Sequence, residues 1–63
     1  KVNINTATAE QLDVLPGVGP STAKSIITYR TQKGLFKKTS DLMNVPGIGQ
    51  AKYDAMRGQV TVG

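Results

Sequence analysis

The chain is short and basic, with 63 residues, a net charge of +4 and a sequence pI of about 9.8. This length allows one small domain, which we place over residues 1–63. Because the chain has no Cys and no His, it lacks disulfides, the usual zinc ligands and any side chain that titrates near neutral pH when unperturbed. We therefore expect a binding protein without catalytic activity, cofactor, metal site or small-molecule substrate, whose partners are anionic.

The first half of the chain is predicted to form two helices joined by a tight turn. Residues 8–11 read TAEQ and match a capping box, so a first helix should cover about residues 9–14. A proline and two glycines then favour a turn over residues 15–19. A proline suited to the first helical turn opens a second helix over about residues 20–32, and Gly34 can cap its C-terminus.

The second half is predicted to repeat this arrangement after a connector. Thr39 or Ser40 can cap a short third helix. A second turn covers residues 46–49, and a fourth helix follows over about residues 50–57 until Gly58 stops it. Both chain ends alternate apolar and polar residues, so the fold class is mainly all-α, with four to five short helices and short extended termini.

An internal repeat links the two halves, because residues 12–26 and 42–56 match at an offset of 30. One Leu, one Pro and both turn glycines are identical in the two copies, and three further positions are apolar in both. The repeat units extend over about residues 8–33 and 39–57. The turn and core positions repeat and the surface positions do not, which predicts a tandem of two similar units.

Each turn, PGVG in the first copy and PGIG in the second, has a structural and a functional interpretation. In the structural one, glycines reverse the chain while Val18 and Ile48 fill the core. In the functional one, glycines let another molecule approach the backbone, and the following helix start offers amides to a phosphate. The nucleotide-binding patterns GxGxxG and Walker A are both incomplete here, so we reject a nucleotide-binding enzyme.

Positive charge is concentrated in the middle of the sequence. Between Val14 and Ser40 there are five bases and no acid, whereas the rest of the chain has a net charge of −1. The five bases are Lys24, Arg30, Lys33, Lys37 and Lys38. This distribution predicts one basic flank, which is typical of a protein that binds a phosphate backbone, and ordinary solvated lysines are the alternative.

Several segments together resemble a known family. VNINTA at residues 2–7, LPGVGPSTAKSIITYR at 15–30, GLF at 34–36, PGIG at 46–49 and VTV at 60–62 resemble the C-terminal helix-hairpin-helix DNA-binding domain of the ComEA family of competence proteins. The resemblance covers essentially the whole chain. It implies a tandem helix-hairpin-helix fold, (HhH)2-like, whose two hairpins straddle the minor groove of double-stranded DNA.

The resemblance also implies which residues contact DNA phosphates. They do so through backbone amides, hydroxyls and lysines, and this binding does not depend on the DNA sequence. They are Gly17, Val18, Gly19, Ser21, Thr22 and Lys24 in the first copy, and Gly47, Ile48, Gly49, Gln50 and Lys52 in the second. Lys37 and Lys38 in the connector either flank the same groove or face solvent. Because Asp54 stands where the first copy has Lys24, the first hairpin is expected to bind more tightly.

The function that the resemblance implies is a receptor for double-stranded DNA in natural transformation. Its location would be extracytoplasmic, in the periplasm or on the outer face of the cytoplasmic membrane. Attachment to the membrane would occur only through a segment that is not present in this chain. Components of a DNA-uptake channel or pilus are further candidate partners. Two alternatives stay open: a structural or protein-interaction module that has lost DNA binding, and a DNA-targeting appendage of a repair enzyme. The VNINTA segment favours the uptake family.

Overall fold

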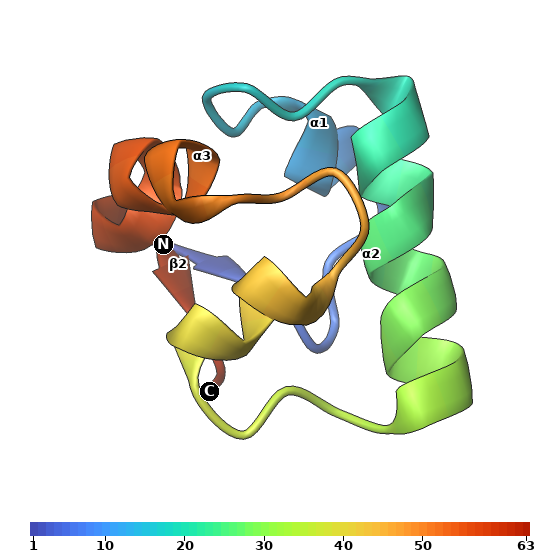
Figure 1. Cartoon of the computed structure of the whole chain (residues 1–63). Helices are drawn as coiled ribbons and strands as arrows, with labels where there is room; N and C mark the ends of the chain where they lie inside the picture. Colours follow the sequence, from blue (N-terminus) through green and yellow to red (C-terminus); the bar gives the residue numbers. More distant parts are fainter.

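Seven short elements follow one another in the structure, a computed structural model that describes all residues 1–63 (Figure 1). They are strand β1 (Val2–Asn3), helices α1 (Ala9–Asp13) and α2 (Pro20–Lys33), the 3-10 helix η1 (Thr39–Asn44), helix α3 (Gln50–Met56), the 3-10 helix η2 (Arg57–Gln59) and strand β2 (Val60–Thr61). The prediction of a mainly helical fold with short extended termini is confirmed. No helix combines the length and the apolar character needed to cross a membrane.

Helices α1 and α2 begin and end where their sequence signals place them, to within one residue. At the start of α1 the Thr8 hydroxyl accepts a hydrogen bond from the Gln11 amide at 3.2 Å, and the Gln11 side chain accepts one from the Thr8 amide at 2.9 Å. Helix α2 starts at Pro20 and ends at Lys33. Gly34 follows with a φ of 95°, a left-handed conformation that glycine adopts without strain.

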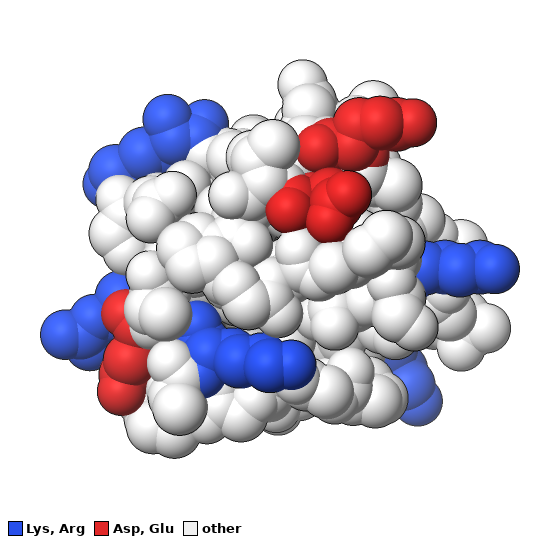
Figure 2. All heavy atoms as spheres, turned by 90° about the horizontal axis from the view of Figure 1, so that it is seen from above, with Lys and Arg blue, Asp and Glu red and all other residues white.

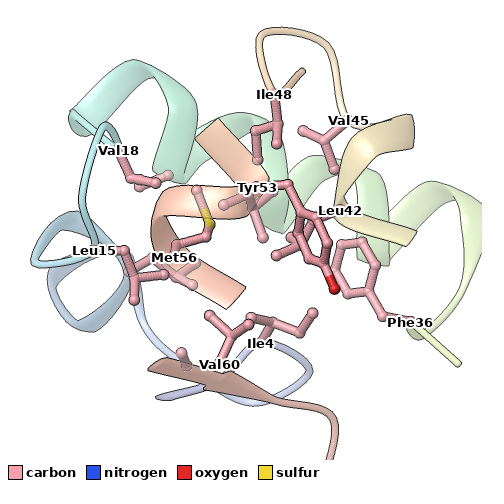
Figure 3. Packing of buried hydrophobic residues seen from close by; sticks show 14 residues of the cluster. Ile4, Leu15, Val18, Phe36, Leu42, Val45, Ile48, Tyr53, Met56 and Val60 are labelled. Carbon is pink, nitrogen blue, oxygen red and sulfur yellow. The ribbon is translucent and has the colours of Figure 1, made fainter. Parts of the chain in front are cut away.

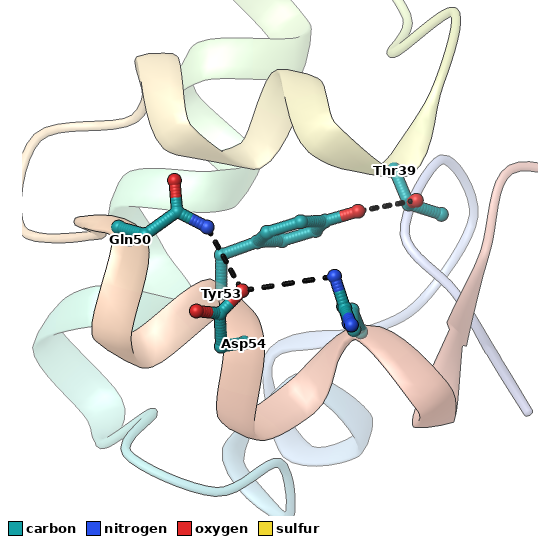
Figure 4. A network of polar contacts seen from close by, with 5 residues as sticks. Thr39, Gln50, Tyr53 and Asp54 are labelled. Atoms are coloured by element: carbon teal, nitrogen blue, oxygen red, sulfur yellow. Dashed lines mark hydrogen bonds and ion pairs between the residues drawn. The ribbon is translucent and has the colours of Figure 1, made fainter.

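The third helix differs from the prediction, because η1 is a 3-10 helix and neither Thr39 nor Ser40 caps it. The Asp41 carboxylate takes that role and accepts hydrogen bonds from the amides of residues 37–38 at 3.1 and 3.3 Å. The Thr39 hydroxyl instead lies 2.9 Å from the Tyr53 hydroxyl (Figure 4). A contact to a residue 14 positions along the same repeat therefore removes this hydroxyl from its local capping partners.

The end of the fourth helix also differs from the prediction, because Gly58 does not stop it. Helix α3 ends at Met56, and the chain continues through Gly58 as the 3-10 turn η2. Helices often tighten into 3-10 geometry in their last turn, and a single glycine is compatible with that turn. The tightened turn leads directly into β2.

The two chain ends pair as a short parallel sheet, in which Val2 lies opposite Val60. Asn5 ties this sheet to the connector. Its side-chain oxygen accepts from the Phe36 amide at 2.7 Å, and its side-chain nitrogen donates to the carbonyls of Phe36 and Val62 at 2.9 and 3.3 Å. The VNINTA, GLF and VTV segments thus form one hydrogen-bonded clasp, which gives a physical reason for their presence in the same chain.

The core is one cluster of 14 buried residues, all apolar apart from the hydroxyl of Tyr53 (Figure 3). Ten of them form five pairs at the repeat offset of 30 residues. The pairs are Leu12 with Leu42, Leu15 with Val45, Val18 with Ile48, Ala23 with Tyr53, and Ile26 with Met56. The repeat seen in the sequence is therefore a repeat of packing, and the clasp segments add the remaining four, Ile4, Ala7, Phe36 and Val60.

Candidate nucleic-acid interface

Each hairpin contains two glycines, and the fold requires only the first of them. Gly17 and Gly47 have φ values of 75° and 94°, which side chains other than glycine rarely adopt. Gly19 and Gly49 have φ values of −99° and −102°, which are open to any residue, and a Cβ at either would meet no atom within 4 Å. As helix N-cap residues they also lack the side-chain cap that Ser, Thr, Asp or Asn would give. Their small size leaves the hairpin surface open to another molecule.

The middle residue of each hairpin faces inward. Val18 and Ile48 are only 5% and 4% exposed, and their amides donate to the carbonyls of Leu15 and Val45 at 3.1 and 3.0 Å. Both residues were predicted to contact DNA through their backbone amides. The structure gives those amides acceptors inside the protein, so Val18 and Ile48 anchor the hairpins to the core.

A row of free amides surrounds each anchored residue. The helical hydrogen-bond ladder starts only when the Ala23 amide donates to the Gly19 carbonyl at 2.9 Å and the Tyr53 amide to the Gly49 carbonyl at 3.0 Å. The amides that donate to no protein acceptor are those of Gly17, Gly19, Ser21 and Thr22 in the first copy, and of Gly47, Gly49, Gln50, Ala51 and Lys52 in the second. Successive free amides form a concave donor surface of the kind that binds anions.

The two hairpins contact each other reciprocally. The aliphatic stem of Lys52 lies over Gly17. Its Cγ, Cδ and Cε are 3.5, 3.7 and 4.0 Å from the point where a Cβ would stand if that glycine had one. At the equivalent point the Thr22 hydroxyl oxygen lies 3.9 Å from the Cβ position of Gly47. The repeat offset makes residue 52 equivalent to 22 and residue 47 equivalent to 17. The hairpins therefore form one continuous surface with approximate twofold symmetry.

Charged side chains differ between the two copies. Lys24 is exposed and has no ion-pair partner. At the equivalent position Asp54 accepts a hydrogen bond from the Gln50 side chain at 2.8 Å and lies 3.9 Å from the Arg57 guanidinium (Figure 4). The Gln50 side chain is thus held by a neighbour on its own helix. The first copy presents a free cation where the second presents a paired acid.

The bases of the central segment do not form the single flank that was predicted. Helix α2 is about 20 Å long and runs from the first hairpin to the connector, which holds Lys37 and Lys38 at the opposite end of the molecule (Figure 1). Arg30 is drawn inward, where it donates a hydrogen bond to the Ile4 carbonyl at 2.9 Å. Figure 2 accordingly shows basic side chains projecting on several sides, with acidic ones at the upper right and again at the lower left among basic ones. The connector that contains Lys37 and Lys38 therefore lies away from the first hairpin.

The fold and its paired hairpins define a class of protein. The helix-hairpin-helix motif family matches residues 1–61, and the chain belongs to this family. The chain is 46% identical over 61 residues to ComE operon protein 1 of Bacillus subtilis. The aligned region covers 97% of the chain and 30% of that protein. The resemblance to the ComEA family is therefore confirmed.

Two further relatives widen the comparison. The chain is 45% identical over 62 residues to human endonuclease/exonuclease/phosphatase family domain-containing protein 1, which covers 98% of the chain and 11% of that protein. It is 39% identical over 61 residues to an uncharacterised Haemophilus influenzae protein, covering 95% of the chain and 54% of that protein. The chain thus spans about half or less of each relative. The human match, like the Bacillus subtilis one, extends over nearly the whole chain.

Proposed function

We propose that this chain binds double-stranded DNA independently of sequence, through the two hairpins acting together. One observation carries the proposal: Gly19 and Gly49 are glycines that the fold does not require, and each stands beside amides that have no acceptor within the protein. Bare backbone with free donors suits phosphate oxygens, which every DNA sequence presents alike. The net charge of +4 favours the same ligand.

The two-hairpin surface suits a duplex better than a single strand. The reciprocal contacts at Gly17 and Gly47 place two similar donor surfaces side by side, and a duplex presents two phosphate backbones across one groove. Sequence-independent binding of single strands commonly uses aromatic rings on which bases stack. Here Tyr53 and Phe36 are buried, and Tyr29 stacks on Phe36 with ring centroids 5.2 Å apart.

The cellular role that we propose is that of a DNA receptor module in natural transformation, outside the cytoplasmic membrane. Its support is the 46% identity to ComE operon protein 1 together with the resemblance to the ComEA family of competence proteins. A DNA-targeting module within a nuclease-like protein is a second candidate, supported by the 45% identity to the human endonuclease/exonuclease/phosphatase family protein. Both roles use the same DNA-binding surface, and neither requires catalysis by these 63 residues.

The proposal is tested by titrating two unrelated duplexes of about 20 base pairs, and a matched single strand, at low and physiological salt. We expect equal affinity for both duplexes, weaker binding of the single strand, and a dissociation constant on the order of micromolar at physiological salt. If about four phosphates are contacted, the slope of log K against log salt is roughly −3.6. A tenfold preference for one duplex would contradict sequence-independent binding.

A matched variant shows whether the hairpins carry the binding. In the double variant Gly19→Leu with Gly49→Leu, the new Cβ atoms meet open space and the φ values suit any residue, so the domain should keep its circular dichroism spectrum. Because Leu is a poorer helix N-cap than Gly, the unfolding temperature should fall while the domain stays folded. It should lose duplex binding at physiological salt. If a folded double variant binds duplex with unchanged affinity, the hairpins do not bind the DNA. That result would favour a module that binds protein partners.

A further inference from the structure

We propose that Lys52 acts at the hairpin of the other repeat, where its ammonium binds the DNA phosphate seated on the first hairpin. This inference rests on the proposed function and refines its site. The family pattern places Lys52 with the second hairpin, since it follows Gly49 by only three residues. In space its side chain lies on Gly17 of the first hairpin.

In the contact between Lys52 and Gly17, the lysine methylene groups lie on the protein surface and the ammonium group extends into solvent. Three successive carbons of Lys52 lie within 4.0 Å of the Cβ position of Gly17, so the stem runs along the glycine. The residue is exposed, and its ammonium has neither a hydrogen-bond acceptor nor an acidic partner in the protein. Its charge is therefore available beside the free amide of Gly17.

The equivalent contact in the opposite direction, from the first repeat to the second hairpin, is made by an uncharged residue. Thr22 extends from the first repeat toward Gly47, and only its hydroxyl reaches the second hairpin, 3.9 Å from the Cβ position of that glycine. The first hairpin therefore has Lys52 of the other repeat over its Gly17, and Lys24 follows this hairpin on helix α2. The second hairpin is served by one hydroxyl, with the acidic Asp54 nearby on its own helix.

The crossing makes the first phosphate site a composite of both repeats. A first repeat without the second would retain Gly17, Gly19 and Lys24 but would lack the cation that lies over its first glycine. The difference in DNA affinity between the two hairpins should then be larger than the replacement of Lys24 by Asp54 alone would cause. It also couples the two repeats in binding, because α3 must be docked for Lys52 to reach Gly17.

The test is a pair of double-mutant cycles measured by duplex titration. Lys52→Met keeps the aliphatic stem and removes the charge, so it should weaken duplex binding about fivefold and reduce the salt slope by about 1. In the Gly19→Leu background, where the first hairpin is blocked, that loss should shrink to less than about twofold, because the two changes affect the same phosphate. In the Gly49→Leu background the fivefold loss should persist.

Every other pattern overturns the proposal. A loss that persists with Gly19→Leu and disappears with Gly49→Leu assigns Lys52 to the second hairpin. An equal loss in both backgrounds means that Lys52 acts only through long-range charge. Failure of the unmodified chain to bind duplex at low salt refutes the proposed function itself, which is a separate result. Unfolding temperatures of all variants control for stability.

A charge exchange provides an independent check. The double variant Thr22→Lys with Lys52→Thr keeps the net charge and moves the crossing lysine from the first hairpin to the second. We expect its duplex binding to become more sensitive to Gly49→Leu and less sensitive to Gly19→Leu than that of the unmodified chain. Unchanged sensitivities would show that the crossing does not determine which hairpin receives the charge.

Discussion

The two repeats are alike in backbone and core and unlike in charge. Their hairpins share the same φ values to within about 20°, with glycines at equivalent positions and the same inward amide at the middle residue. Their following helices differ, since α2 has 14 residues and α3 has seven. Lys24 is replaced by Asp54, and Thr22 by Lys52. Packing therefore maintains the symmetry, while the surface positions are free to diverge.

This difference shows which features the fold demands and which it merely permits. Each repeat buries a leucine completely, at Leu12 and Leu42, because neither unit can exclude water from its apolar face alone. No such constraint acts on an exposed residue next to a hairpin. This difference can be tested by substitution, beginning with the core, where equivalent changes in the two repeats should have similar effects.

The largest effect is expected from removing the equivalent core leucines. Leu12→Ala and Leu42→Ala should each lower the free energy of unfolding by about 2–5 kcal/mol, and by similar amounts, because both side chains are 0% exposed. Urea denaturation followed by circular dichroism measures this. Leu35→Ala is the control, because Leu35 is 66% exposed and its loss should cost at most about 0.5 kcal/mol. A cost for Leu42→Ala below about 1 kcal/mol would mean that the second repeat contributes little to the core.

The next effect separates the hairpins in DNA binding. Gly19→Leu should weaken duplex affinity about tenfold, or about 1.4 kcal/mol, and Gly49→Leu clearly less, because Lys52 lies over the first hairpin whereas the acidic Asp54 follows the second. Both variants should unfold at nearly the same temperature, since their new side chains meet open space. The measurement is a fluorescence anisotropy titration at fixed salt. Equal losses would show that amides alone determine affinity and that the difference in charge is irrelevant.

A smaller effect should follow from making the second repeat resemble the first. Asp54→Lys replaces a paired acid with a cation at the position of Lys24, so duplex affinity should rise about threefold to fivefold and the salt slope should steepen by about 1. Asp54→Asn is the matched control, because it breaks the 3.9 Å contact to Arg57 without adding a cation. If both variants bind equally, the gain comes from losing the acid or freeing Gln50 rather than from a new phosphate contact.

The elements of the fold were predictable because their signals are local. The capping box at Thr8, the prolines and the glycines act within a few residues, and the repeat doubled the proline and glycine signals of the hairpins. What the sequence could not predict depends on contacts between distant residues. Asn5 bonds to Phe36 across 31 positions, and Thr39 leaves its expected cap for Tyr53, 14 positions away. Propensity carries no information about such partners.

The glycine turns of the candidate site were predictable from local signals, whereas the assignment of its residues to DNA phosphates came from the family resemblance. The glycines that make the hairpins were found directly from their spacing. The inward amides of Val18 and Ile48 depend on the exact turn geometry, and the position of Lys52 over Gly17 depends on how the repeats dock. One signal was present: at an offset of 30, position 22 repeats as 52 and position 17 as 47, so any crossing contact must occur twice.

The smallest effect is expected in the connector, which joins the repeats and belongs to neither. Lys37 and Lys38 lie at the end of α2 that is remote from the first hairpin, so their charges reach a bound phosphate only through solvent. The Debye length is about 8 Å at physiological ionic strength and about 30 Å at 0.01 M, compared with about 20 Å for the length of α2. Lys37→Met with Lys38→Met should therefore leave duplex affinity within about twofold at physiological salt and reduce it only at low salt. Lys24→Met, beside the hairpin, should reduce affinity at both. If the connector variant loses as much as Lys24→Met at physiological salt, the DNA path must extend along α2 to the connector, and the two hairpins cannot be the whole interface.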